Sequence, residues 1–169
     1  AGTGAHTVTG LKADVVATTA SGAVDITAVE AVSITTGSGA TTLSQATGTK
    51  ATVDAEALAD GVLLTLKGAG DFDVTNVISN VTNAATGTVN VTLDDDGSGS
   101  AVNATVTNNA GSGTLTVANG TFADGDTLTL AGTGAHTVTG LKADVVATTA
   151  SGAVDITAVE AVSITTGSG

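Results

Sequence analysis

Seven aspartates in short stretches beside glycine or strand-forming residues are the groups of this chain whose type and spacing could do chemistry. Calcium prefers several hard oxygen ligands, and carboxylates in glycine-rich turns supply them. The sequence therefore predicts candidate calcium ligands at Asp71, Asp73, Asp94, Asp95, Asp96, Asp124 and Asp126. The alternative interpretation is a set of solvated turns, because Asp-Gly pairs favour turns and charge at a sheet edge discourages aggregation.

No set of residues in the sequence suggests catalysis. His6 and His136 are the only histidines and there is no cysteine, so neither a zinc site nor a histidine general base is expected. The chain has no nucleophile elbow, phosphate-binding loop or dinucleotide fingerprint. We therefore expect no enzyme activity and no cofactor other than calcium.

The charge balance restricts the partners. The net charge is −12, and the four basic residues are all lysines. The phosphates of nucleic acids and of anionic membrane surfaces bind basic side chains, and this chain has few of them, so neither is an expected partner. No run of 18 apolar residues occurs, so we expect no membrane insertion.

Repeats organise the chain. Residues 1–39 return unchanged as residues 131–169, so a long repeat starts at Ala1 and starts again at Ala131. A weaker repeat relates 52–77 to 116–141, and 20–27 resembles 84–92. We therefore divide the chain into half-units 1–66 and 67–130, followed at 131–169 by the start of the next repeat. We expect this chain to be part of a longer array.

The elements that must position the aspartates are short strands. Many runs rich in Thr, Val, Leu and Ile alternate apolar and polar residues, and Gly, Asn, Asp and Ser separate them. Phe72 and Phe122 are the only aromatic residues and proline is absent, so the core must be thin. This favours an all-β parallel β-solenoid over the alternative, a string of immunoglobulin-like β-sandwiches.

A glycine pair followed by an aliphatic residue, xGxGxxxUx, recurs at 1–9, 36–44, 67–75, 110–118 and 131–139. It resembles the nonapeptide of the RTX (haemolysin-type) secreted bacterial proteins, which implies a parallel β-roll with calcium in its turns. The calcium-binding Asp of that nonapeptide is replaced by His6, Thr41, Phe72, Leu115 and His136. The stretches SGAVDIT and VSITTGSGA also look like repeat regions of giant secreted bacterial surface proteins, including adhesins, S-layer-like proteins and extracellular fibres.

These observations predict a structural repeat of an extracellular, cell-surface fibre, stalk or lattice whose partners are further copies of the same repeat. The alternative is an adhesin module stabilised by calcium. Ice binding by outward threonines and a β-helical polysaccharide enzyme rank lowest. The TxT motifs are irregularly spaced along the chain, so an aligned threonine array is not expected.

Overall fold

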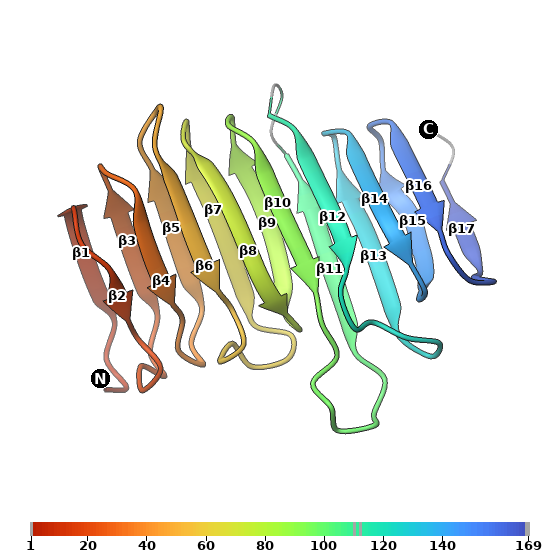
Figure 1. Cartoon of the computed structure of the whole chain (residues 1–169), viewed down its shortest axis with the longest axis horizontal. Helices are drawn as coiled ribbons and strands as arrows, with labels where there is room; N and C mark the ends of the chain where they lie inside the picture. The colour runs from red at the N-terminus through yellow and green to blue at the C-terminus, as the bar shows by residue number, and fades with distance from the viewer. Residues whose placement is uncertain (1, 110, 112, 168–169) are drawn as a thin grey trace.

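The computed structural model describes residues 2–109, 111 and 113–167 as a parallel β-solenoid of about 8 turns with ~19 residues per turn (Figure 1). Ala1, Ala110, Ser112, Ser168 and Gly169 belong to the predicted repeats and lie outside the described residues. No helix occurs among the residues described. The strands are β1 (His6–Leu11), β2 (Val15–Val16), β3 (Val24–Ala28), β4 (Val32–Thr35), β5 (Thr41–Gln45), β6 (Lys50–Asp54), β7 (Leu63–Gly68), β8 (Asp71–Val77), β9 (Asn80–Ala85), β10 (Val89–Leu93), β11 (Asn103–Asn108), β12 (Leu115–Asn119), β13 (Thr127–Gly132), β14 (His136–Leu141), β15 (Asp144–Ala150), β16 (Val154–Ala158) and β17 (Ile164–Thr166).

The chain alternates between two parallel sheets. The odd-numbered strands form a nine-stranded sheet in sequence order, and the even-numbered strands form an eight-stranded sheet. The predicted parallel β-solenoid is therefore confirmed, and the alternative string of β-sandwiches is not what the chain forms. The half-unit boundaries at 66/67 and 130/131 fall inside β7 and β13, so strand pairing continues across both.

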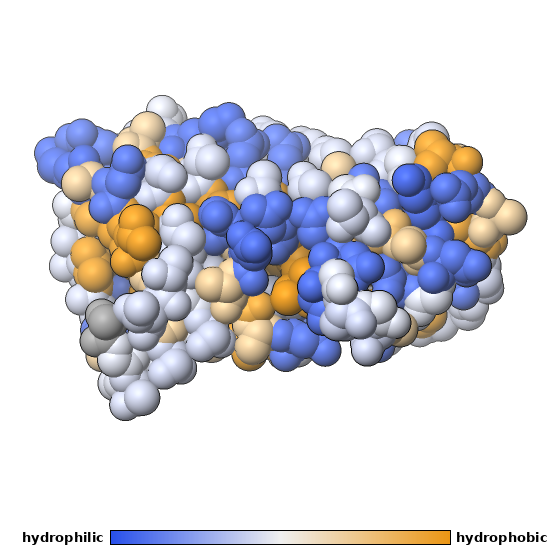
Figure 2. Space-filling view, turned by 60° about the horizontal axis from the view of Figure 1, so that its bottom comes forward, coloured by the Kyte–Doolittle hydropathy of each residue, from blue (hydrophilic) through white to orange (hydrophobic). Residues whose placement is uncertain are grey.

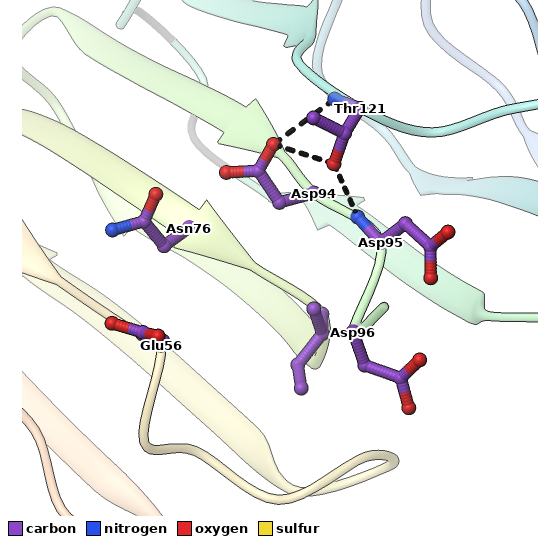
Figure 3. Close-up of a pocket in the computed structure, with 7 residues that line it drawn as sticks. Glu56, Asn76, Asp94, Asp95, Asp96 and Thr121 are labelled. Atoms are coloured by element: carbon purple, nitrogen blue, oxygen red, sulfur yellow. Dashed lines mark hydrogen bonds between the residues drawn. The ribbon is translucent and has the colours of Figure 1, made fainter. Parts of the chain in front are cut away.

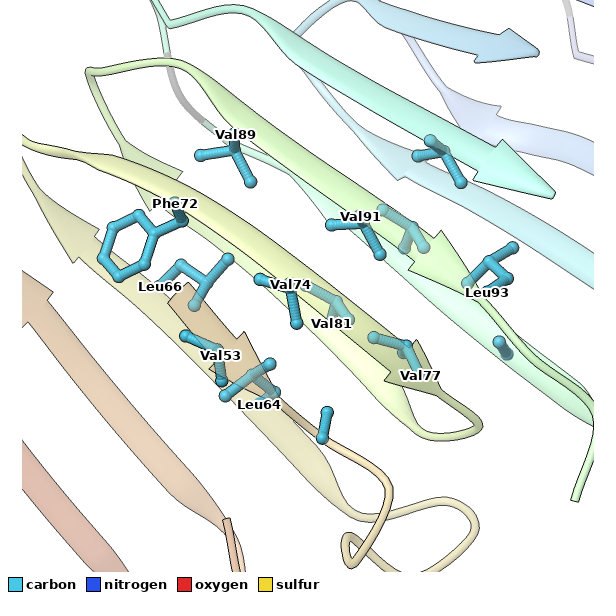
Figure 4. Close-up of a cluster of buried hydrophobic side chains, with 14 of the residues drawn as sticks. Val53, Leu64, Leu66, Phe72, Val74, Val77, Val81, Val89, Val91 and Leu93 are labelled. Atoms are coloured by element: carbon cyan, nitrogen blue, oxygen red, sulfur yellow. The ribbon is translucent and has the colours of Figure 1, made fainter. Parts of the chain in front are cut away.

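A thin apolar core fills the space between the two sheets. Alternate residues of each strand point inward, so Val53, Leu64, Leu66 and Val74 stack in rows along the solenoid (Figure 4). Both phenylalanines, Phe72 and Phe122, are fully buried. Small branched side chains suffice here because packed sheets lie only about 10 Å apart.

Two kinds of turn join the sheets. The upper edge of Figure 1 carries the turns from the nine-stranded to the eight-stranded sheet, and the lower edge carries the reverse turns. In the tightest coils, a strand and its neighbour in the same sheet are separated by one short strand and two sharp turns. The coil from Val24 in β3 to Thr41 in β5 is an example. The coil that brings Leu115 beside Val89 is longer, because a long loop leaves the lower edge between β10 and β11 (Figure 1).

Glycines stack directly on the backbone of the previous coil. A Cβ on Gly22 would lie 2.2 Å from the carbonyl oxygen of Gly4, and one on Gly39 would lie 2.2 Å from that of Gly22. Gly70 and Gly87 repeat this contact at the upper edge, where a Cβ on Gly87 would lie 2.3 Å from the Gly70 oxygen. Gly39 and Gly70 belong to the xGxG pattern, whereas Gly22 and Gly87 lie outside it, so close coil-to-coil approach requires glycines in both kinds of turn.

The two identical segments occupy opposite sheets. The strands β1, β2, β3 and β4 of residues 1–39 correspond to β14, β15, β16 and β17 of residues 131–169, which is a shift of 13 strands. Because 13 is odd, every strand of the second copy lies in the other sheet. Gly152, the counterpart of Gly22, accordingly stacks on Gly134 at the upper edge, with the same 2.2 Å separation.

The weaker inner repeat divides these 13 strands unequally. The match of 52–77 to 116–141 relates β6, β7 and β8 to β12, β13 and β14, which is a shift of six strands within the same sheet. The match of 20–27 to 84–92 relates β3 to β10, a shift of seven strands between sheets. The shift of seven strands contains one strand more than the shift of six, and this extra strand is β5. The turns with stacked glycines lie at the lower edge before β5 and at the upper edge after it.

We expect Gly87→Ala to lower the free energy of unfolding by about 1–3 kcal/mol, because its Cβ would overlap the Gly70 carbonyl. The matched control is Gly4→Ala, whose Cβ would meet no atom within 4 Å. That change should leave stability unchanged or raise it by less than about 1 kcal/mol. Urea unfolding followed by circular dichroism measures both, and equal effects would contradict the stacking argument.

Candidate functional site

A surface pocket of about 440 Å³ opens at the lower edge, beside the end of β10 (Figure 3). The residues that line it come from the end of β8 and from the turns of successive coils: Glu56, Asn76, Ile78, Asp94, Asp95, Asp96 and Thr121. Figure 2 brings this edge forward and shows hydrophilic residues along its length, with apolar patches between them. The predicted acidic triplet therefore shares this pocket with one further acidic residue, Glu56.

The triplet is held by hydrogen bonds within the turns. Asp94 Oδ1 accepts bonds from the backbone N–H of Thr121 (3.0 Å) and from its hydroxyl (2.9 Å). The same hydroxyl accepts the backbone N–H of Asp95 (2.8 Å), so the two turns are tied together (Figure 3). Asp95 and Asp96 each cap their own loop, since they accept the N–H groups of Gly97 (3.0 Å) and Ser98 (2.8 Å). The bonds from Ser98 lower the pKa of Asp96.

Asp124 and Asp126 lie in the next turn of the same edge and share a smaller pocket with Asp95, of about 240 Å³. Asp126 is buried, and its two carboxylate oxygens accept the backbone N–H groups of Val102 (2.9 Å) and Ala123 (2.8 Å). Asp126 therefore joins two loops of neighbouring coils. Asp124 is exposed.

Asp71 and Asp73 lie elsewhere, on the outer face of β8. Asp71 accepts the backbone N–H of Thr88 (2.7 Å), and Asp73 pairs with Lys50 and accepts a bond from the Asn90 amide (2.8 Å). The bond from Lys50 is the main reason why the pKa of Asp73 is lowered. The structure thus brings five of the seven predicted aspartates to one edge and places the other two on a sheet face.

Three polar residues of the larger pocket were not predicted from the sequence: Glu56, Asn76 and Thr121. Asn76 has a φ of 58°, in the left-handed region that asparagine tolerates better than most residues. An asparagine that interrupts the alternation of a strand was the available signal. Glu56 and Thr121 carried none, because their neighbours across the pocket belong to other coils and lie far away in the sequence.

One oxygen each of Asp94, Asp95 and Asp96 and both oxygens of Asp126 accept hydrogen bonds that hold the turns. No group of three or more His, Cys, Asp or Glu side chains is placed to hold a metal ion within the described ranges. Calcium binding therefore stays a prediction, and the observed role of these aspartates is to cap and tie loops.

The two histidines show how the two copies of one sequence differ in surroundings. His136 is buried, and its Nε2 lies 3.0 Å from the carbonyl oxygen of Ala131, so Nε2 carries the proton. Burial lowers the pKa of His136, and the bond to Ala131 offsets this in part. His6 is only half-buried, because no coil covers its N-terminal side among the described residues.

Outward threonines align better than their sequence spacing indicated. Thr42, Thr65, Thr82 and Thr107 pair in register on successive strands of the nine-stranded sheet. The varying coil length hid this row, which is built mostly from threonines outside the TxT motifs. The TxT motifs at 105–107 and 127–129 pair out of register, because Thr105 lies opposite Thr129 and Thr107 opposite Ala131. The adjacent outward row holds Ser44, Lys67 and Ala84 instead. Ice binding by a broad threonine face stays a hypothesis that this mixed neighbour row does not favour.

Comparison of the chain with family models, curated proteins and solved structures finds no match in any of the three. Among residues 2–109, 111 and 113–167, no helix is long and apolar enough to cross a membrane.

We expect calcium to change the melting temperature of this chain by less than about 2 °C, because calcium needs several converging oxygen ligands and no three acidic side chains converge among the described residues. Thermal melts with calcium, with magnesium and with a chelator measure this. A bound ion at a hundred times its Kd would add about 2.7 kcal/mol. A rise of about 5 °C with calcium alone, abolished in a chain carrying Asp94→Asn, Asp95→Asn and Asp96→Asn, would contradict the expectation and place calcium there.

Proposed function

We propose that this chain is a structural repeat of an extracellular fibre, stalk or lattice, in which coils stack end to end into a stiff rod. The observation that carries the proposal is the pair of parallel strand ladders, which run without a break from β1 to β17. Each coil contacts only the coils before and after it, so stability and length grow together as coils are added.

Several features support a mechanical role. The core is continuous along the axis, and both edges are held by backbone contacts between successive coils. The two identical segments share a packing pattern, with strands and stacked glycines in equivalent places. A net charge of −12 keeps such a rod soluble and separates neighbouring rods.

The cellular setting is part of the proposal. The resemblance to repeat regions of giant secreted bacterial surface proteins supports a rod outside the cell, with further copies of the repeat as its partners. An antibody raised against the chain should label intact, unpermeabilised cells of the source organism. Labelling only after permeabilisation would remove the extracellular setting and leave the mechanical role.

The rod predicts a fixed length increment. A chain extended by a second copy of residues 40–169 adds 13 strands, or six and a half coils, and should lengthen by about 31 Å at about 4.8 Å per coil. Electron microscopy or small-angle X-ray scattering of the two chains measures the increment. A hinge at the junction, or an increment that varies between molecules, would contradict a stiff rod.

A further inference from the structure

An ionisable ring lies in the core at the start of β14. His136 is 1 % exposed, and its Nε2 donates to the carbonyl oxygen of Ala131. Its Nδ1 is also buried and has no hydrogen-bond partner among the described residues. Protonation would therefore place a second N–H group and a positive charge in the core, where neither is satisfied.

The fold needs a buried side chain at this position but not an ionisable one. In three further copies of the xGxG pattern the same position is buried and holds a side chain that does not titrate: Thr41, Phe72 and Leu115. Phe72 is the counterpart of His136 in the inner repeat, and its backbone N–H donates to the Thr88 carbonyl (2.9 Å). The backbone N–H of His136 makes the equivalent bond to Ala153 (2.8 Å). The histidine thus adds a response to protons at a position that packs equally well without one.

No counter-charge faces the His136 ring among the described residues. Its neighbours in the eight-stranded sheet are β12 and β16, and turns join it to β13 and β15. The charged residues of these four strands are Asp144 and Asp155, and both are exposed on outer faces. Lys142 follows β14 at the opposite edge of the solenoid. Burial is therefore not offset by an ion pair, which agrees with the lowered pKa of His136.

We propose that His136 is an acid-sensitive latch, which holds the turn between β13 and β14 closed while its ring is neutral and opens that turn when the ring is protonated. The turn is tied to the previous coil by two bonds. Gly134 N–H donates to the Asn108 carbonyl (2.7 Å), and the Asn108 side-chain amide donates to the Ala135 carbonyl (2.6 Å). The Asn83 amide in turn donates to Asn108 Oδ1 (3.0 Å), so opening the turn disrupts a buried chain of amides that links three coils.

Acid destabilises the closed latch. Because the pKa of His136 is lowered in the folded chain, the folded chain binds fewer protons than the unfolded chain below about pH 6.5. The stability that the neutral ring contributes is complete above this pH and is lost as the pH falls below it. This response goes beyond the proposed structural role, and in an array it would recur with every repeat.

NMR titration tests the ring itself in the unmodified protein. The chain has two histidines, so their ring signals can be assigned with a single variant. The His136 ring should change protonation with a midpoint below about pH 6.5. A midpoint at or above that value overturns the proposal.

Hydrogen exchange separates opening of the latch from general acid unfolding. The backbone amides of His136 and Phe72 make equivalent bonds, and only the first belongs to a titrating residue. Between about pH 7.5 and about pH 5, protection corrected for the intrinsic exchange rate should fall at least tenfold more at His136 than at Phe72. Equal losses would mean that acid loosens the whole solenoid through its carboxylates, which overturns the latch.

A matched pair of variants tests the effect on stability. His136→Gln keeps an amide N–H for the Ala131 carbonyl but cannot bind a proton in this pH range, and His6→Gln is the control in the identical segment. Between about pH 7.5 and about pH 5, the melting temperature of the wild-type chain and of His6→Gln should fall by at least about 3 °C more than that of His136→Gln. The same fall in all three chains overturns the proposal. The NMR and exchange measurements use the unmodified chain, so they decide the question even where His136→Gln fails to fold.

Discussion

The close contact between glycine backbones on successive coils is the constraint on which the structure depends. Where Gly22, Gly39, Gly87 or Gly152 meets the previous coil, a Cβ would lie 2.2–2.3 Å from a carbonyl oxygen. This contact lets the tightest coils close with two short strands and two sharp turns. Thin coils leave room for Val, Leu and Ile but for few aromatic side chains, which accounts for the composition. From β6 to β13, six acidic residues line pockets at the edge opposite the stacked glycines, where the loops are longer: Glu56, Asp94, Asp95, Asp96, Asp124 and Asp126.

The odd number of strands in the repeat has a consequence for the surface. Because identical segments lie in opposite sheets, a face or edge of one copy recurs on the other side of the rod in the next. The pairing of sequence identity with opposite placement therefore presents the same strand sequences on both sheets of the solenoid.

The sequence was sufficient for the fold class, because strand alternation, missing aromatics and paired glycines all depend on local pattern. It could not show that Asp94, Asp95, Asp124 and Asp126 share an edge, because that depends on how many strands separate them. The same limit hid the row of Thr42, Thr65, Thr82 and Thr107, whose members are unevenly spaced along the chain. To count the half-coils, one must know that a single strand, β5, lies between Gly39 and Gly48. The sequence pattern alone does not show whether one strand or a full coil of two strands lies between two such glycines.

The most direct test of the 13-strand repeat is disulfide formation in this cysteine-free chain. Thr116 and Thr137 are paired neighbours on the outer face of the eight-stranded sheet, whereas Thr129 lies on the outer face of the other sheet. Thr116→Cys with Thr137→Cys should form a disulfide under mild oxidation, because neighbouring strands bring their Cα atoms within bonding range. Thr129→Cys with Thr137→Cys should not form one. Cross-linking of the second pair and not the first would place residues 136–141 in the same sheet as residues 6–11 and contradict the alternation.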